Sequence, residues 1–312
     1  MTKNLCALTL LLFSWTAPLP LFAASELAIG YANISARVSP LWIAQEKGFF
    51  AKYGVPVQAV YMPGSPVMIA SLSAGQIQLA NSGGTAALGA AVGGLDLKVI
   101  GTFTSHIPFD LVVRPTIKGA QDLRGKRLGV QVIGGTIWMG AMLGLEHLGL
   151  EPRRDAVQII AVGNQTMLIQ ALEKGTVDAT VVDSAFSNGI VARESYLQQQ
   201  PDTARNALKA WMEGVAYALS PKMKASVLET IARHLKISDP ALAQRGYEDL
   251  LRATDRKPFP SLEGLRNVQR LMKLRNAAVG GLKTESLIDG KLMKELDESG
   301  FIDQLYTAYG VK

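Results

Sequence analysis

A unit of helix and strand in residues 65–82 recurs in residues 165–182, and this repeat constrains the fold more than any other feature of the chain. In the first copy an apolar helix ends at Gly75, because glycine adopts the left-handed backbone conformation at the lowest cost. Residues 76–79 then alternate polar and apolar side chains, which is the periodicity of a β-strand. The second copy keeps the register, since its helix ends at Gly175 before an apolar strand. Such a repeat predicts two α/β lobes of similar build.

The strand and helix that precede each copy repeat as well. An apolar strand at 29–31 and a helix ending at Gly48 correspond to a strand at 128–130 and a helix ending at Gly149. Any two strand–helix–strand units can share a glycine at the helix end, so this match alone is compatible with coincidence. A register that holds over roughly fifty residues favours two related lobes.

Polar turns stand next to the predicted strands. The turn Asn81–Thr85 follows one strand and precedes an apolar helix from Ala86. If the strands are parallel, these turns lie at the carboxyl edge of a sheet, where open α/β sheets hold ligands. Backbone N–H groups at helix starts bind anions without side-chain charges. We expect the helices that start near Pro40, Ser65, Thr85, Thr136 and Asn164 to point their N-termini into one cleft.

The composition is that of a globular protein without catalytic or metal-binding motifs. The chain has 312 residues, 48% of them hydrophobic and 19% charged, which is enough for two α/β domains. A net charge of +6 comes without a basic run interleaved with aromatics, so we expect no nucleic acid partner. The 3 histidines show no metal-ligand spacing, and no catalytic triad or acid pair stands out. We therefore expect no cofactor, no metal and no enzymatic activity.

The N-terminal segment 1–24 predicts a secretory signal peptide. Its apolar run, residues 5–17, is too short to span a bilayer as a stable helix, which argues against the alternative of a membrane anchor. Prolines follow this run, and cleavage is expected near Ala23 or Ala24. The one cysteine, Cys6, lies inside the segment, so the mature protein would have no disulfide. We expect a periplasmic protein.

The lobes are predicted to be joined by two crossings, at residues 111–113 and 189–192. The prediction places residues 25–111 and 192–312 in the first lobe and inserts residues 112–191 as the second lobe. From Pro201 onward the spacing of apolar residues is helical.

Four segments in this order resemble one known family: SPLWIAQEKGFFAKYGVPV, SLSAGQIQLANSGG, DLRGKRLGV and LEKGTVDA. The family is that of the solute-binding proteins of ABC importers for sulfonates, taurine and nitrate, grouped with thiamine-pyrimidine precursor proteins (NMT1/SsuA-like). The resemblance implies a type II periplasmic binding protein fold, with two α/β lobes joined by two crossing strands and the ligand in the cleft. It also implies a monomer that delivers a small-molecule ligand to an ABC permease in the inner membrane.

The resemblance leaves alternatives open. The ligand is a small organic or inorganic anion on the main reading, and a neutral heterocycle such as a thiamine-precursor pyrimidine on the second. An enzyme similar to thiamine-pyrimidine synthase is less favoured, because that enzyme carries a cysteine-rich segment that this chain lacks. An extracellular sensor domain is disfavoured because no membrane-spanning segment and no kinase follow in the sequence. The chain departs from the family after Asp183, where only residues 184–188 precede the return crossing, so the second lobe is predicted to be shortened there.

The candidate ligand-binding residues match the cleft edge of the family or lie in the same loops. They are Asn33, Ser35, Arg37, Gly64, Ser65, Asn81, Ser82, Gly83, Thr85, His106, Gly135, Thr136, Trp138, Asn164 and Asp183.

Each candidate also has a structural interpretation. The Gly/Ser turns are equally consistent with helix capping. Arg37 is expected to pair bidentately with an anion, the alternative being a surface ion pair. Trp138 either walls the ligand site or packs in a core. For His106 a structural hydrogen bond is favoured, and for Asp183 both readings stay open.

Overall fold

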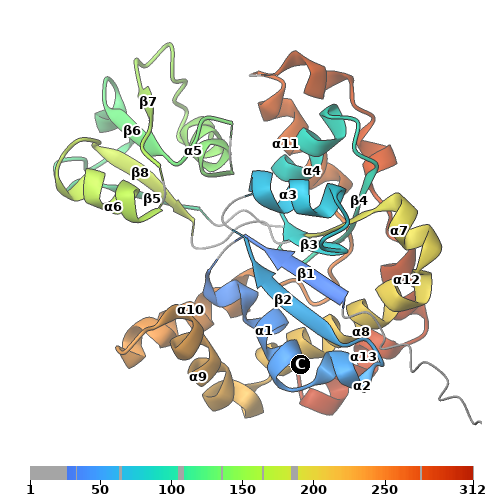
Figure 1. The fold of residues 1–312 in the computed structure, drawn as a ribbon. Helices are drawn as coiled ribbons and strands as arrows, with labels where there is room; N and C mark the ends of the chain where they lie inside the picture. Colours follow the sequence, from blue (N-terminus) through green and yellow to red (C-terminus); the bar gives the residue numbers. More distant parts are fainter. Residues whose placement is uncertain are drawn as a thin grey trace, which may run out of the picture.

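The structure is a computed structural model that describes residues 27–32, 34–62, 65–104, 109–134, 136–163, 165–183, 189–274 and 276–311. The predicted signal peptide, residues 1–24, and its cleavage point lie outside these ranges. The described strands form two sheets (Figure 1). The predicted α/β class is confirmed, and the described residues contain no helix that is both long and apolar enough to cross a membrane.

The first sheet has five strands in the order β2-β1-β3-β9-β4. These strands are β1 (Leu27–Tyr31), β2 (Val57–Tyr61), β3 (Leu79–Ser82), β4 (Leu97–Thr102) and β9 (Gly189–Arg193). The second sheet has four strands in the order β5-β8-β6-β7. These are β5 (Phe109–Val113), β6 (Arg127–Val130), β7 (Gln158–Ala161) and β8 (Ala179–Asp183).

Helices α1 to α6 connect the strands or precede them. They are α1 (Ser39–Glu46), α2 (Phe49–Lys52), α3 (Ser65–Ser73), α4 (Gly84–Val92), α5 (Thr136–His147) and α6 (Gln165–Glu173). The C-terminal helices are α7 (Glu194–Gln199), α8 (Pro201–Leu219), α9 (Lys224–Leu235), α10 (Pro240–Ala253), α11 (Leu262–Met272), α12 (Lys291–Glu298) and α13 (Phe301–Tyr309). The short 3-10 helix η1 (Ala36–Val38) precedes α1. This C-terminal run confirms the helical periodicity seen from Pro201 onward.

The two sheets share one arrangement of strands, which confirms the repeat. In the first sheet β2, β1 and β3 are parallel, and β9 is antiparallel to β3. In the second sheet β7, β6 and β8 are parallel, and β5 is antiparallel to β8. The first sheet carries one further strand, β4, beside β9.

A glycine in β1 and another in β6 let α3 and α6 pack closely on the two sheets. A Cβ at Gly30 would lie 3.3 Å from Met68 and 2.6 Å from Ile77. A Cβ at Gly129 would lie 3.0 Å from Leu168 and 3.2 Å from Val177. The neighbours occupy equivalent positions in the two copies, so the repeat extends to side-chain packing.

The sheets to which β5 and β9 belong show that the chain passes between the sheets at other residues than predicted. Strand β5 lies in the second sheet and β9 in the first, so the chain changes sheet before each strand and not within residues 111–113 or 189–192. The connecting segments include residues 105–108 and 184–188, which lie outside the described residues. The division into two lobes stays a prediction, with its proposed boundaries moved to the segments before β5 and β9. The predicted shortening at 184–188 also stays a prediction.

Strand β3 starts later than the alternation of polar and apolar side chains in residues 76–79 predicts. The N–H groups of Gln76 and Ile77 donate to the Ser71 carbonyl, which closes the end of α3. The strand therefore begins at Leu79, and Asn81 and Ser82 are its last residues instead of the first residues of a turn. Helix α4 follows at Gly84, with Gly83 as its N-cap residue.

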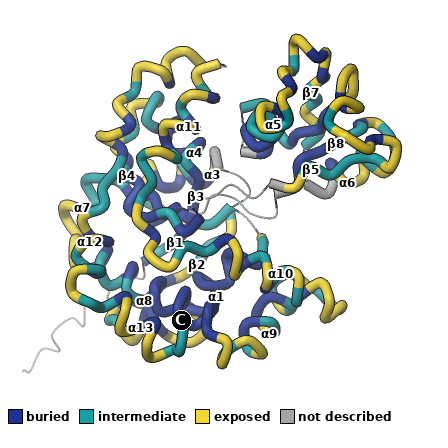
Figure 2. The backbone as a smooth tube through the Cα atoms, turned by 180° about the vertical axis from the view of Figure 1, so that it is seen from behind, coloured by how far each residue is buried: buried dark blue, intermediate teal, exposed yellow. Residues whose placement is uncertain are grey.

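The largest core lies between the first sheet and helix α8, which is buried along most of its length (Figure 2). Gly214 in α8 faces α1 so closely that a Cβ would lie 2.2 Å from the Pro40 carbonyl oxygen. Its neighbour Glu213 is buried and accepts hydrogen bonds from Lys52 Nζ at 2.8 Å and from two tyrosine hydroxyls. Close backbone approach and a satisfied buried carboxylate hold α8 against α1, α2 and α13.

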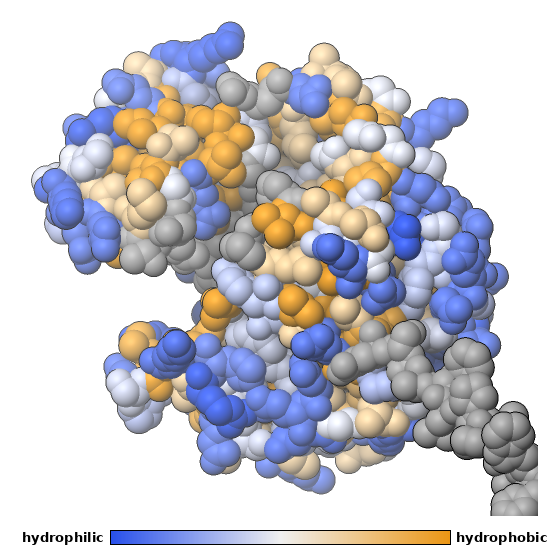
Figure 3. All heavy atoms as spheres, viewed as in Figure 1, coloured by the Kyte–Doolittle hydropathy of each residue, from blue (hydrophilic) through white to orange (hydrophobic). Residues whose placement is uncertain are grey.

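A second core joins the second sheet and α5 to helices α4 and α11. Its buried residues include Ile137 and Met139 of α5 together with Leu265 and Leu271 of α11. Figures 1 and 2 both show α5 next to α11. On another side the surface is hollowed: Figure 3 shows a recess between the part that holds the four-stranded sheet and the helices α9 and α10.

Candidate functional site

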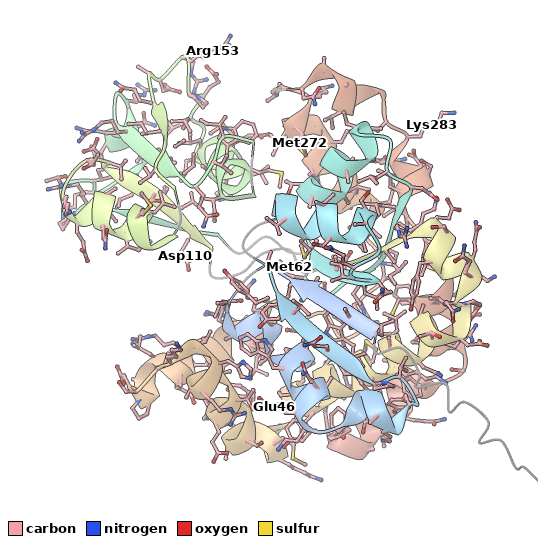
Figure 4. All side chains as sticks on the ribbon, in the orientation of Figure 1. Glu46, Met62, Asp110, Arg153, Met272 and Lys283 are labelled. Atoms are coloured by element: carbon pink, nitrogen blue, oxygen red, sulfur yellow. The ribbon has the colours of Figure 1, made fainter. Side chains whose placement is uncertain are left out.

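The carboxyl edges of both sheets border the connections between them. Ser82, the last residue of β3, pairs with Gly189, the first residue of β9. Asp183, the last residue of β8, pairs with Phe109, the first residue of β5. Six chain steps separate Asp183 from Gly189, so these two residues lie within about 22 Å of each other. Ser82 is one strand spacing, about 5 Å, from Gly189, so the ends of β3 and β8 lie within about 27 Å of each other. Figure 4 shows Met62 and Asp110 on the two sides of this region.

Buried polar groups without a partner mark the end of β3. Asn81 is 6% exposed and Ser82 is 3% exposed. Neither Asn81 Oδ1 nor Ser82 Oγ has a hydrogen-bond partner among the described residues. Ser35 Oγ, which follows the adjacent strand β1, is also buried without a partner. A buried polar group left unpaired costs about 1–3 kcal/mol, so such a group calls for an explanation, and a ligand provides one.

Helix starts lie at the same edge. Helices α3, α5 and α6 begin at Ser65, Thr136 and Gln165, each shortly after a parallel strand. Helix α4 begins directly after Gly83, whose extended backbone (φ −87°) carries no side-chain cap. Thr85 is buried in the first turn of α4. Helix N-termini, which bind anions through backbone N–H groups, thus lie at the edge that holds the orphaned oxygen atoms.

Arg37 is committed to another part of the protein. Its Nη2 lies 2.7 Å from Asp249 Oδ1, and its Nε donates to Asp249 Oδ2 at 2.7 Å. The side chains of Arg37 and Asp249 are 1% and 13% exposed. The structure thus pairs Arg37 bidentately with a carboxylate of α10, and the pair is buried instead of superficial. A ligand role for Arg37 stays a prediction. Asp249 lies 212 residues away in the chain, so the sequence around Arg37 does not predict this partner.

Trp138 packs in a core. It is 5% exposed and belongs to the buried cluster that α5 shares with α11. The packing interpretation is the one that the structure supports, because a ring this buried has little surface for a ligand.

The remaining candidates are only partly described. Asn33, Gly64, His106, Gly135 and Asn164 lie outside the described residues. The side chains of Ser65, Thr136 and Asp183 are not described, although their backbones begin α3, begin α5 and end β8. Their ligand roles stay predictions.

Four of the loops at this edge carry no charge. The segments that follow β1, β2, β6 and β7 are residues 32–36, 62–66, 131–135 and 162–166, and the sequence places no Asp, Glu, Lys or Arg in any of them. Among the described residues no group of three metal-ligating side chains occurs. The chemistry available in these four loops is that of amides, hydroxyls and backbone dipoles, and Asp183 at the end of β8 is an acidic residue at the same edge.

Sequence reasoning missed an apolar component of the edge. Large hydrophobic side chains are exposed in the same loops, at the end of β2 or in the first turns of the helices that follow. They are Ile34, Tyr61, Val67, Val132 and Met167. In Figure 3, apolar surface borders the recess. The spacing of apolar residues in a helix does not show which of them are exposed, so the exposure of Met167 could not be predicted from the sequence.

Comparison with known proteins agrees with this architecture. Residues 35–186 match the family described as NMT1/THI5 like. This segment is an NMT1/THI5-like domain. The predicted family resemblance is confirmed. The NMT1/THI5-like domain includes α1 to α6 and the loops at both carboxyl edges.

Individual known proteins resemble the chain at low sequence identity. The riboflavin-binding protein RibY of Chloroflexus aurantiacus is 24% identical over 225 residues, which cover 64% of this chain and 64% of that relative's length. The structure of a putative periplasmic sulfonate-binding protein SsuA from Methylobacillus flagellatus superposes with a TM-score of 0.70 at 18% identity, covering 88% of this chain and 96% of that one.

The periplasmic nitrate-binding protein NrtA from Synechocystis PCC 6803 superposes with a TM-score of 0.66 at 14% identity, covering 89% of each chain. These structural likenesses show the fold, which is that of periplasmic binding proteins, and confirm the predicted architecture around the NMT1/THI5-like domain.

Proposed function

We propose that this protein is the periplasmic substrate-binding component of an ABC importer. It captures a small solute where the carboxyl edges of the two sheets meet and delivers it to a permease in the inner membrane. The observation that carries the proposal is the pair of buried, unpartnered oxygen atoms of Asn81 and Ser82. The proposal includes export with cleavage near Ala23 or Ala24, a monomeric state, no nucleic acid partner and no catalytic step.

A small anion of the sulfonate, taurine or nitrate kind is the first candidate ligand. The helix starts at Ser65, Gly84, Thr136 and Gln165 would supply N–H donors and positive dipole ends, which bind oxyanions without a cationic side chain. The two structural neighbours described above, which bind sulfonate and nitrate, support this choice.

A neutral heterocycle, such as a thiamine-precursor pyrimidine, is the second candidate. The ion pair of Arg37 with Asp249 favours it, because that pair removes the one cationic side chain assigned to the site. The riboflavin-binding relative supports it as well. An enzyme of the thiamine-pyrimidine-synthase kind is disfavoured, because the sequence has no cysteine beyond Cys6.

A thermal-shift screen of the mature protein tests the proposal. The panel contains nitrate, taurine, methanesulfonate, riboflavin and an aminopyrimidine, each well above its expected dissociation constant. A true ligand stabilises the folded state by about 2.7 kcal/mol at a hundredfold excess over its dissociation constant. The matched control is Ser82→Ala, in which the same ligand should stabilise less. A panel that leaves the melting temperature unchanged, extended to other small solutes without success, would contradict the proposal.

A further inference from the structure

Two apolar side chains occupy equivalent places in the two repeats and are exposed to the same degree. Val67 is the third residue of α3, and Met167 is the third residue of α6. Each is 47% exposed. A residue two positions into a helix lies about 3 Å along the axis from its start, so both side chains stand in the first turn beside the carboxyl edge. Hydrophobic exposure at matched positions on both sheets is not a requirement of the fold.

The side chain of Met167 bends back over the loop that follows β7. A Cβ at Gly163 would lie 2.8 Å from Met167 Sδ. On the other repeat, Met62 follows β2 directly, and its Sδ would lie 3.4 Å from a Cβ at Gly30. Thioethers are polarizable and flexible, so they adapt to the shape of an apolar partner.

Exposed hydrophobic side chains concentrate at this edge. Ten large hydrophobic residues are exposed in the described part of the chain, and half of them lie at this edge. These five are Ile34, Tyr61, Val67, Val132 and Met167. The loops and first turns that hold these five make up a small part of the chain. A gathering of exposed apolar side chains beside a polar site is the pattern of a ligand site or an interface.

A small inorganic oxyanion would not use this surface. Nitrate or sulfate has no apolar part to bury, and the edge offers it only uncharged donors. An organic ligand uses both components, because its polar end pairs with Asn81 and Ser82 while its body covers the apolar side chains. The exposed apolar side chains therefore favour an organic ligand over an inorganic oxyanion, whereas the hydrogen-bond donors could serve either.

We propose that Val67 and Met167 determine the specificity of the site: one from each repeat, they contact the apolar body of an organic ligand whose polar end binds at Asn81 and Ser82. The proposal rests on the solute-binding function proposed above and narrows its ligand to organic molecules with an apolar part. The proposal applies equally to a ligand whose polar end is charged and to one whose polar end is neutral.

Calorimetric titration with two homologous series tests this proposal. The probes are methane-, butane- and octanesulfonate and the carboxamides with the same alkyl chains, so that charge and body vary separately. In the wild type, affinity should rise by roughly fourfold for each methylene that becomes buried, in whichever series binds. The variants Val67→Thr and Met167→Gln keep the side-chain size and remove apolar surface. Each should lower the affinity of the longest bound member by about fivefold and leave the shortest member unchanged.

The control variant is Leu274→Gln, which alters a side chain that is 69% exposed after α11, away from the strand ends. It should leave all affinities unchanged. An affinity that does not depend on chain length would overturn the proposal, as would Val67→Thr and Met167→Gln variants that behave like the control or that weaken all members equally. Absence of binding by every member and by every compound of the earlier screen, in a protein that melts cooperatively, would overturn the solute-binding function itself.

Discussion

The ion pair between Arg37 and Asp249 makes a prediction that separates a structural role from a ligand role. The two side chains share two hydrogen bonds of 2.7 Å and are 1% and 13% exposed. Removing one partner of a buried pair leaves an uncompensated charge and costs about 3–5 kcal/mol. Arg252 lies 3.9 Å from Asp249, so Arg37→Ala leaves the acid a second basic neighbour. Asp249→Asn leaves Arg37 without that carboxylate and should therefore destabilise more.

The assay combines urea unfolding with calorimetric titration of whichever ligand the screen finds. Both single variants should lower the free energy of unfolding by a few kcal/mol, and the folded fraction of each should bind the ligand as the wild type does. The double variant Arg37→Met/Asp249→Leu should recover most of the loss, because a buried ion pair replaced by apolar side chains is often close to neutral.

The opposite pattern would refute this reasoning. If Arg37→Ala unfolds at the wild-type urea concentration but no longer binds an anion, while Asp249→Asn binds normally, Arg37 is a ligand residue and the ion pair is incidental.

Three further predictions follow from the packing, the buried carboxylate and the N-terminal segment. Gly214→Ala places a Cβ 2.2 Å from the Pro40 carbonyl and should lower the free energy of unfolding by about 1–3 kcal/mol. Gly89→Ala, in a helix with open space around the new Cβ, should not destabilise. Burial alone would raise the pKa of Glu213, but hydrogen bonds from Lys52 and two tyrosine hydroxyls outweigh it and lower the pKa below the ordinary value of 4.5. Its contribution to stability is therefore present above that value and lost as the pH falls through the lowered pKa, so melting temperatures between about pH 6 and pH 3 should fall less in Glu213→Gln than in the wild type. Intact-mass analysis of periplasmic material should show a chain cleaved near residue 24, and an uncleaved membrane-bound chain would contradict the predicted signal peptide.

Local patterns were sufficient to predict the repeat and the positions of most elements. Glycines such as Gly75 and Gly175 end the two corresponding helices, because both adopt a positive φ of 74–75° that other residues rarely tolerate. The order of the parallel strands then follows from the strand–helix–strand connections. The sequence analysis placed Asn81 and Ser82 in a turn, whereas they are the last residues of β3. The strand starts later than predicted because the N–H groups of Gln76 and Ile77, whose side chains alternate as in a strand, donate to the end of α3.

Long-range pairing could not be predicted in the same way. The partner of Arg37 lies in α10, and nothing in the loop around Arg37 distinguishes a ligand from a distant carboxylate. Apolar periodicity likewise does not tell a buried helix face from the exposed first turn that holds Met167, because exposure depends on which other elements cover the helix.

The central claim is that the polar groups at the end of β3 bind a ligand, and Ser82→Ala tests it most directly. The variant removes a buried hydroxyl that has no partner among the described residues, so the ligand-free protein should melt at the wild-type temperature or above it. The affinity for the best ligand of the screen should fall by about tenfold, the equivalent of one lost hydrogen bond of about 1.4 kcal/mol. A lower melting temperature with unchanged ligand affinity would show that the hydroxyl stabilises the fold and that the site lies elsewhere.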